Sequence, residues 1–166
     1  FQTNKINAEI ILAFGINPSM QRNKSVLVAK GEWLYFLDND SVLDSQTINQ
    51  LLLTIKKFPE AQVIGGPSVL PQPAGNWQKA VQLVFSSDIG VGPLKSRYHS
   101  NGLIRESNEK EIILCNMAIK KSVFVDMKGF NENLFPNEEN EFLSRLSEKI
   151  KIIYSPLMIV YREHRR

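Results

Sequence analysis

The sequence predicts an α/β domain built on a mainly parallel sheet. Short apolar runs alternate along the chain with segments whose apolar residues recur at helical spacing. The clearest run, residues 33–37, is rich in aromatic residues and too short for a helix, so a buried parallel strand fits it best. A length of 166 residues suits one domain with a core of its own.

Strands are predicted wherever a short apolar run is bounded by turn-forming residues. Gly15 ends the first of these runs, and Gly66 and Pro67 follow the third. In chain order the predicted strands cover residues 8–14, 33–37, 62–65, 111–119 and 151–154, with a further apolar stretch at 157–160.

Helices are predicted from apolar spacing and from capping residues. Asn17 and Ser19 offer a cap for the first helix, and Asp44 or Ser45 caps a second helix that ends at Phe58. Asn137 caps the last one. The other predicted bounds are 20–30, 77–85, 122–127 and 138–149. The intervening residues 86–110 are predicted to form a long loop, which in a compact domain is usually functional or disordered.

The composition excludes several classes of protein. The net charge of +3 comes from scattered basic residues and a short tail, so nucleic-acid binding is not required, and an anionic substrate or an acidic membrane surface suits the charge equally well. The single cysteine, Cys115, excludes an internal disulfide and a cysteine-cluster metal site. No apolar run approaches the ~20 residues that span a bilayer, so a membrane anchor would lie outside these residues.

Two carboxylates, Asp38 and Asp40, directly follow the predicted strand at 33–37. In an open α/β sheet, ligands bind beyond the carboxyl ends of the strands, so this pair lies where a ligand is expected. Carboxylate oxygens suit Mg²⁺ or Mn²⁺, which commonly take further ligands from a phosphate. From these residues alone, an ordinary turn or helix cap is the other interpretation, because Asp, Asn and Ser all favour such positions.

Seven short motifs occur together in one order along the chain. They are Gln-Arg-Asn at 21–23, Ala-Lys-Gly-Glu at 29–32, Asp-Asn-Asp at 38–40, Gly-Gly-Pro at 65–67, Cys-Asn-Met-Ala-Ile-Lys-Lys at 115–121, Gly-Phe-Asn-Glu at 129–132 and Asn-Glu-Glu-Asn-Glu-Phe at 137–142. With this ordered set, residues 8–166 resemble the GT-A glycosyltransferases of family 2, which build bacterial polysaccharides from nucleotide sugars. The resemblance implies the GT-A (Rossmann-like) fold, a three-layer α/β sandwich with a mainly parallel central sheet.

The resemblance also implies roles for two pairs of carboxylates. Asp38 and Asp40 match the family's Asp-x-Asp motif, where Mn²⁺ or Mg²⁺ bridges the carboxylates and the diphosphate of a nucleoside-diphosphate sugar. Glu138 and Glu139 match a Glu-Asp pair whose second member is the base for the acceptor hydroxyl. Glu139 departs from the usual Asp, and general-base work tolerates either carboxylate within about 2.6–3.2 Å of the hydroxyl. Without the family, the helix dipole alone favours acidic residues in a first turn.

Five further candidates each have a structural alternative. Arg22 and Asn23 resemble family residues near the nucleotide, although an exposed helix position is the commoner fate of an arginine. Asn116 is either a substrate contact or a structural amide with its hydrogen bonds satisfied, and Glu141 either contacts the acceptor or lies on the helix surface. His164 lies where many relatives carry a histidine near the metal or diphosphate, and a solvated tail residue is its alternative.

Two features of the family are missing or displaced. Relatives begin with an apolar strand ending in Pro-x-x-Asn and a helix, and neither precedes the strand predicted at 8–14. Phe14 and Gly15 stand where an Asp often ends that strand. The expectation is therefore a single glycosyltransferase domain over residues 1–166 that is incomplete at its N-terminus. The missing unit carries much of the nucleotide pocket, so these residues alone can fold and still lack activity.

The predicted function is metal-dependent, inverting sugar transfer from a nucleoside-diphosphate sugar to a saccharide or lipid-linked acceptor. The expected setting is cell-surface polysaccharide synthesis at the cytoplasmic face of the plasma membrane, with no nucleic-acid partner. The first alternative is a non-catalytic domain that binds a sugar nucleotide or a protein partner, favoured by the incomplete pocket and by Glu139. The second is a nucleotidyltransferase, which normally has a Gly-rich, basic loop near its N-terminus, and no such loop is visible.

Overall fold

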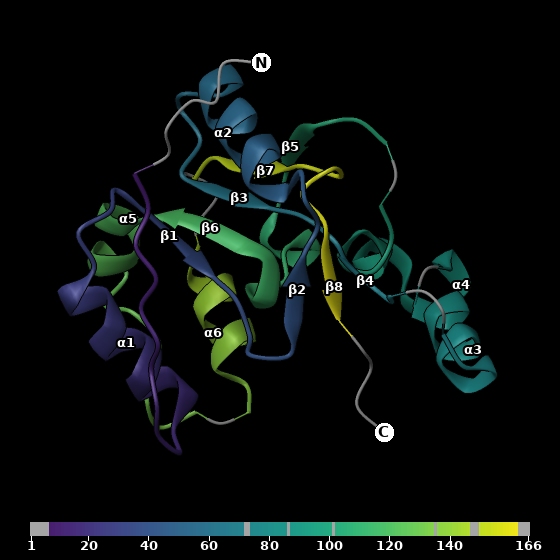
Figure 1. The fold of residues 1–166 in the computed structure, drawn as a ribbon, viewed down its shortest axis with the longest axis horizontal. Coiled ribbons are helices and arrows are strands. Elements are labelled where there is room, and N and C mark those ends of the chain that lie inside the picture. The colour runs from purple at the N-terminus through teal and green to yellow at the C-terminus, as the bar shows by residue number, and fades with distance from the viewer. Residues whose placement is uncertain are drawn as a thin grey trace.

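Two sheets organise the part of the chain that the computed structural model describes, residues 7–71, 74–85, 87–100, 102–134, 136–146 and 150–162. In the larger sheet the spatial order is β1 (Trp33–Phe36), β6 (Met117–Lys120), β3 (Val63–Gly65), β7 (Ile152–Tyr154) and β5 (Arg105–Ser107). In the smaller sheet the order is β2 (Ser41–Leu43), β8 (Val160–Arg162) and β4 (Ser68–Val69). Figure 1 shows β2 and β8 continuing from one end of the larger sheet.

The larger sheet is mixed, and this corrects the prediction of a mainly parallel sheet. β3 and β7 pair in parallel, whereas β6 is antiparallel to both β1 and β3, and β5 is antiparallel to β7. β1, β3 and β7 therefore run in one direction and β5 and β6 in the other. The apolar pattern could not show this, because a strand buried on both faces has the same composition whichever way it runs.

Helices cover both faces of the larger sheet, which confirms the predicted α/β sandwich of three layers. On one face lie α1 (Pro18–Val28), α5 (Lys121–Asp126) and α6 (Glu138–Arg145), and on the other lies α2 (Thr47–Lys57) (Figure 1). Successive strand residues point to opposite faces, so Val63 packs with the first group of helices and Ile64 with the second.

An aromatic cluster supports the first of these faces. Phe36 at the end of β1 meets Phe124 and Phe130, and both of these meet Phe142 of α6, with ring centroids 4.7 to 5.7 Å apart. The side chain of Phe142 is fully buried. Pairs of aromatic rings at such distances stabilise a core beyond their buried area, so the cluster fixes the start of α6 against the end of β1.

The start of α1 confirms the predicted cap, and the segment before it corrects a prediction. Asn17 caps the helix, accepting a hydrogen bond from the Met20 N–H at 3.1 Å. Residues 8–14, predicted as a strand, form no strand and leave Leu12 and Phe14 exposed. An apolar run becomes a strand only where another strand offers hydrogen bonds, and none of the described strands pairs with it.

The second and third predicted helices are both present. α2 begins at Thr47 after Gln46, so neither Asp44 nor Ser45 is the cap; the Asp44 carboxylate accepts a hydrogen bond from the Gln46 N–H at 2.9 Å. α3 (Asn76–Phe85) matches its prediction and exposes Trp77. Among the described residues, no helix has the length and hydrophobicity to cross a membrane.

The region predicted as a long loop contains several short elements instead. α4 (Asp88–Val91), η1 (Gly92–Arg97), β5 and η2 (Glu109–Glu111) divide it. The Glu111 carboxylate of η2 joins β5 and η1 to it, pairing with Arg105 at 2.6 Å and accepting from the Ser96 hydroxyl at 2.8 Å. Side-chain hydrogen bonds and ion pairs hold these short elements without a regular apolar spacing, so the apolar pattern could not predict them.

Two predicted elements are shorter in the structure. The run at 111–119 becomes a strand only from Met117, because η3 (Leu114–Asn116) precedes β6. α6 ends at Arg145, and residues 147–149, the end of the predicted helix, lie outside the described residues. Asn137 takes the cap position of α6, as predicted, but its side chain makes no capping hydrogen bond.

Candidate functional site

Several chain segments bring polar residues to one edge of the larger sheet. β1 and β3 end there at Phe36 and Gly65, and both are paired with Met117, the first residue of β6. Because β6 runs the opposite way, the residue before its start, Asn116, lies at the same edge as Asp38, which follows the end of β1. Two strands, β1 and β3, therefore end at the edge where the sequence predicts the site, and β6 begins there.

Ion pairs join three of the candidate carboxylates in a chain. Arg22 Nη1 donates to Glu138 Oε1 and Arg22 Nη2 to Asp38 Oδ1, both at 3.1 Å. Arg162 Nη1 lies 3.1 Å from Asp38 Oδ2, and Arg162 Nε lies 3.1 Å from Asp40 Oδ1. Residues from α1, the β1–β2 turn, β8 and α6 are thus brought together through their charges.

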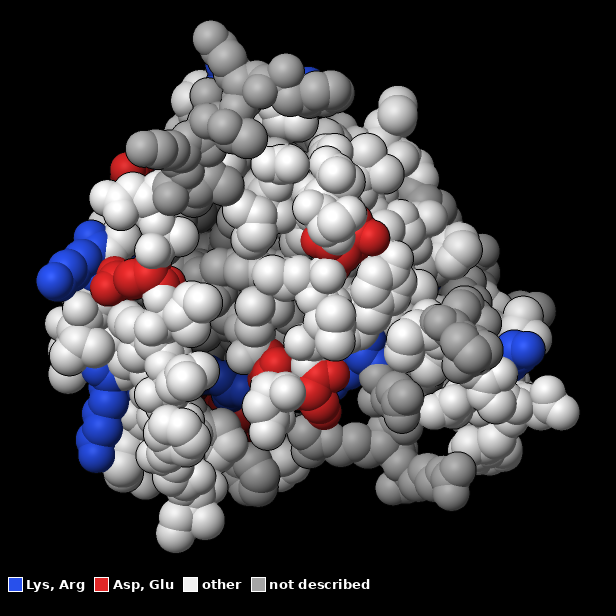
Figure 2. All heavy atoms as spheres, in the orientation of Figure 1, with Lys and Arg blue, Asp and Glu red and all other residues white. Residues whose placement is uncertain are grey.

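Within the described residues, the carboxylates of this chain of ion pairs outnumber its guanidinium groups. Three carboxylates meet two guanidinium groups there, an excess of one formal negative charge in this part of the structure. Glu138 is buried, and no protein group donates to its Oε2 among the described residues. On the face in Figure 2, acidic and basic residues lie side by side around the turn that joins β1 to β2. A buried carboxylate oxygen without a donor is costly, so this edge favours a further cation or donor.

Glu139 lies beside this chain of ion pairs in the first turn of α6. Its Oε1 accepts a hydrogen bond from the Leu114 N–H at 2.9 Å. Burial raises the pKa of Glu139 above its ordinary value, the negative charge of Asp38 adds to the increase, and the Leu114 N–H, Arg97 and Arg22 oppose it. A carboxylate with a raised pKa holds a proton more readily at neutral pH than an exposed one.

The arginine and asparagine of α1 have different surroundings. Arg22 bridges Asp38 and Glu138 and lies over the ring of Phe130 at 5.7 Å. Asn23 clamps a turn: its Nδ2 donates to the Phe130 carbonyl, and its Oδ1 accepts from the Phe130 N–H, both at 2.9 Å. Arg22 is thus part of the acidic edge, whereas the contacts of Asn23 are those of a structural residue.

Asn116 uses its whole amide in structural hydrogen bonds. Nδ2 donates to the Pro67 carbonyl at 2.8 Å and to the Met158 carbonyl at 2.6 Å, and Oδ1 accepts from the Tyr35 hydroxyl at 2.7 Å. The chain comes so close at Gly66 that an added Cβ would lie 2.1 Å from the Met158 carbonyl oxygen. These contacts favour the structural alternative for Asn116 over a substrate contact.

Of the two remaining candidates, the structure describes Glu141, which lies apart from this set of contacts. Glu141 pairs with Arg145 one helical turn further on, at 2.6 Å. His164 lies outside the described residues, so its predicted role at a metal stays a prediction. Glu138 and Glu139, in contrast, both lie at the edge where Asp38 begins the turn after β1.

Arg162 is the residue at this edge that sequence interpretation missed. The sequence alone indicates that it belongs to a basic tail. In the structure β8 pairs with β2, so Arg162 lies opposite Ser41, and Ser41 directly follows Asp40 in the sequence. The buried thiol of Cys115 also interacts with Arg162 and Ser68, and burial raises the pKa of Cys115 to about 11. The apolar stretch at 157–160 was the signal that could have found it. Such a stretch is typical of a strand, and the residues that end a strand lie at a sheet edge.

The donor chemistry of the edge fits a divalent cation in part. No group of three or more His, Cys, Asp and Glu side chains is arranged to hold a metal among the residues that the structure describes. Asp38 and Asp40 nevertheless present carboxylate oxygens from one tight turn, and Glu138 Oε2 has no donor nearby. Mg²⁺ and Mn²⁺ commonly bind through one or two carboxylates together with water and phosphate oxygens, so such a pair suffices.

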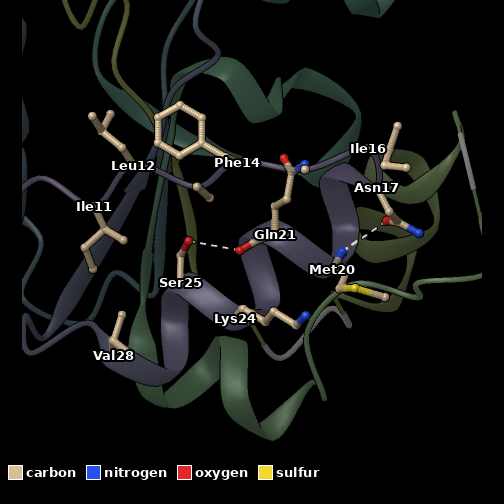
Figure 3. A pocket seen from close by; sticks show the side chains of 12 residues that line it. Ile11, Leu12, Phe14, Ile16, Asn17, Met20, Gln21, Lys24, Ser25 and Val28 are labelled. Carbon is tan, nitrogen blue, oxygen red and sulfur yellow. Dashed lines mark hydrogen bonds between the residues drawn. The ribbon is translucent and has the colours of Figure 1, made fainter.

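A separate hollow lies between residues 11–17 and α1 (Figure 3). Ile11, Leu12 and Phe14 line one side, and Val28 belongs to the other. Lys24 is the charged side chain of this lining. The hollow shares no lining residue with the acidic edge, and its apolar walls supply none of the carboxylate chemistry described above.

Comparisons with known proteins bear on the family and the fold of the chain. The sequence pattern described as "Glycosyl transferase family 2" matches residues 11–127, more than half of the chain. Comparison with curated protein sequences gives no match. Two solved structures of S. aureus TarS 1–349 resemble the fold, one in complex with UDP (TM-score 0.54) and one without (TM-score 0.55), each at 14% identity over 84% of this chain.

The likeness to the solved structures covers only part of those proteins. This chain spans 40% of each TarS chain, and at 14% identity the likeness concerns the fold. The α/β sandwich with helices on both faces and the matched sequence pattern lead to the same conclusion, and both agree with the predicted GT-A type of fold. The chain belongs to glycosyl transferase family 2.

Proposed function

We propose that this chain is the donor-binding and catalytic part of a metal-dependent, inverting glycosyltransferase. Its donor is a nucleoside-diphosphate sugar and its acceptor a hydroxyl group of a saccharide or a lipid-linked saccharide, in the synthesis of a cell-surface polysaccharide. The observation that carries the proposal is the chain of ion pairs through Glu138, Arg22, Asp38, Arg162 and Asp40, with Glu139 beside it.

Asp38 and Asp40 would hold Mn²⁺ or Mg²⁺ together with the diphosphate of the donor. Both carboxylates leave the end of β1 within one turn, which suits a shared ligand. The net negative charge of the ion-pair chain supports the attraction of a cation to this edge. When bound, the cation would stabilise negative charge on the departing nucleoside diphosphate. The UDP in one of the TarS structures makes UDP the first nucleotide to test.

Glu139 would accept the proton of the acceptor hydroxyl. In an inverting transfer, the hydroxyl oxygen forms a bond to the sugar carbon while the bond from that carbon to the diphosphate breaks, and the hydroxyl proton goes to a base. The pKa of Glu139, raised by burial, brings its proton affinity closer to what a general base needs at neutral pH. The Leu114 N–H holds one carboxylate oxygen at 2.9 Å and leaves the other for the acceptor.

Calorimetric titration with UDP and with GDP tests the donor site, first in Mn²⁺ and then in EDTA. We expect binding that requires Mn²⁺ and is lost in Asp40→Ala. Asp126→Ala, which removes an exposed carboxylate on α5, is the matched control and should bind as the parent chain does. Equal affinity with and without Mn²⁺ would count against a metal-bridged diphosphate.

Transfer itself is tested with Glu139→Gln. Gln keeps the oxygen that accepts from the Leu114 N–H but cannot take a proton, so donor affinity should be nearly unchanged while the transfer rate falls by about 10²–10⁴-fold. Sugar transfer from UDP-sugars to a saccharide acceptor gives the readout. A parent chain that binds nucleotide and transfers nothing would instead support a binding domain without catalysis, and a fully active Glu139→Gln would remove Glu139 as the base.

A further inference from the structure

Arg162 occupies the space between the two carboxylates of the β1–β2 turn. Two nitrogens of its guanidinium group lie close to them, Nη1 to Asp38 Oδ2 and Nε to Asp40 Oδ1, each at 3.1 Å. Its side chain is 25% exposed, so these pairs are partly shielded from water. The positive charge of Arg162 therefore lies against one oxygen of each of the two carboxylates that would hold a divalent cation.

The backbone, and not only the side chain, holds Arg162 there. β8 pairs with β2 so that Arg162 faces Ser41, and β8 also pairs with β4 on its other side. Arg162 is the last residue of β8, and Asp40 is the residue immediately before β2. Strand pairing of this kind fixes the Cα of Arg162, while its long side chain remains able to change rotamer.

The two arginines of the edge make different contacts. Arg22 holds the other oxygen of Asp38 and turns to Glu138, and its ion pairs do not include Asp40. Arg162 alone, among the ion pairs of the described residues, links Asp38 to Asp40. A divalent cation bound by the pair would therefore meet the positive charge of Arg162 on the same oxygens, and like charges so close repel strongly.

We propose that Arg162 is an exchangeable counter-cation of the Asp38–Asp40 pair. A divalent cation displaces its guanidinium group from the two carboxylates, and the released group then binds the diphosphate of the nucleotide. The second step, in which Arg162 binds the nucleotide, rests on the proposed function. The first step, in which Arg162 and the cation compete for the two carboxylates, does not depend on it. Guanidinium groups suit this second role because their planar donors match phosphate oxygens and keep their charge at every physiological pH.

The proposal predicts opposite changes in two affinities when Arg162 is replaced. Arg162→Gln should bind Mn²⁺ alone about tenfold more tightly than the parent chain, because the competing charge is gone. In saturating Mn²⁺, the same variant should bind UDP about tenfold more weakly, because a phosphate ligand is lost. A residue that only held the two carboxylates in place would lower both affinities when removed.

Two further variants keep this test decisive. Arg162→Lys retains the charge but has a single nitrogen to approach the two carboxylates, so its Mn²⁺ affinity should lie between those of the parent chain and Arg162→Gln. Arg105→Gln removes an arginine that pairs with Glu111 and should leave Mn²⁺ and UDP affinities unchanged. Far-ultraviolet circular dichroism of each variant, compared with the parent, shows whether it has folded.

The experiment is a titration with MnCl₂ in which electron paramagnetic resonance counts free Mn²⁺, first without nucleotide and then with UDP. Tighter Mn²⁺ binding by folded Arg162→Gln, lost again when Asp40→Ala is added, supports the exchange. Unchanged, weaker or absent Mn²⁺ binding by the folded variant overturns it. Neither result decides the proposed function, which depends on whether the parent chain needs Mn²⁺ to bind UDP.

Discussion

Residues 8–14 and residues 33–40 share an apolar run and differ in structure. Each has an apolar run that leads into a polar turn, and each run predicts a strand. Residues 33–36 form β1, pair with β6 and end in the carboxylates of the candidate site. Residues 8–14 form no strand, and Phe14 is 89% exposed. An apolar pattern therefore indicates that a segment is suited to burial. Whether the segment is buried depends on whether a neighbouring strand pairs with it.

The two regions also differ in what holds them. Around Asp38, ion pairs and an aromatic cluster bind four separate segments to one another. The extended segment is held at Glu9, whose carboxylate accepts from the Lys30 N–H at 2.5 Å and from the Gly31 N–H at 3.1 Å. Substitutions in the first region should therefore change both stability and site geometry, and those in the second should change little.

The largest expected contrast compares Phe142, in the aromatic cluster that contacts the end of β1, with Phe14 of residues 8–14. Phe142→Ala removes a fully buried ring from the aromatic cluster, and we expect it to lower the free energy of unfolding by about 3–5 kcal/mol. Phe14→Ala removes an exposed ring, and its effect should stay within about 0.5 kcal/mol. Urea unfolding of both variants measures this. Equal losses would mean that the exposed segment is packed after all.

A smaller contrast comes from two glutamates that each accept backbone N–H groups. Burial raises the pKa of Glu139 above its ordinary value of 4.5, so its protonated form stabilises the native state below pH 4.5, and this contribution is lost as pH rises through the raised pKa. Glu139→Gln resembles the protonated form. At pH 7 it should be more stable than the parent chain, and the difference should shrink towards pH 4.

The matched control for this pH effect is Glu9→Gln, which changes an exposed carboxylate that also accepts from backbone N–H groups. Its free energy of unfolding at pH 7 should differ from that of the parent by less than about 1 kcal/mol. Chemical unfolding at several pH values compares the three chains. A Glu139→Gln variant that is less stable than the parent at pH 7 would show that the charge of Glu139 is well compensated in the fold.

The smallest expected effect is at Asn17, which links the start of α1 to Glu132. Its Oδ1 caps α1, and its Nδ2 donates to the Glu132 carbonyl at 2.9 Å. Asn17→Ala should lower the free energy of unfolding by about 1 kcal/mol, as is common for a lost cap. Asn17→Asp keeps the capping oxygen and should recover most of the loss in a thermal unfolding experiment. If Asn17→Asp lost as much as Asn17→Ala, the bond to Glu132 would be the important one.

Sequence interpretation was accurate where the signal is local or carried by a family pattern. The strand before Asp38 and the helix that begins at Glu138 depend on residues close together in the chain, and the order of the motifs identified the family. The pairing of β2 with β8 joins residues more than a hundred positions apart. No local pattern encodes that register, so Arg162 looked like a tail residue until the pairing placed it beside Asp38.

The chain has two tryptophans, Trp33 and Trp77, so its tryptophan fluorescence combines emission from two different environments. Trp33 is half-buried at the start of β1 under the ammonium group of Lys120, whereas Trp77 is 72% exposed on α3. Emission from Trp33 should therefore lie at shorter wavelength and report on the strand that leads to Asp38. In a Trp77→Phe chain, a single optical signal would follow that strand through every titration and unfolding experiment.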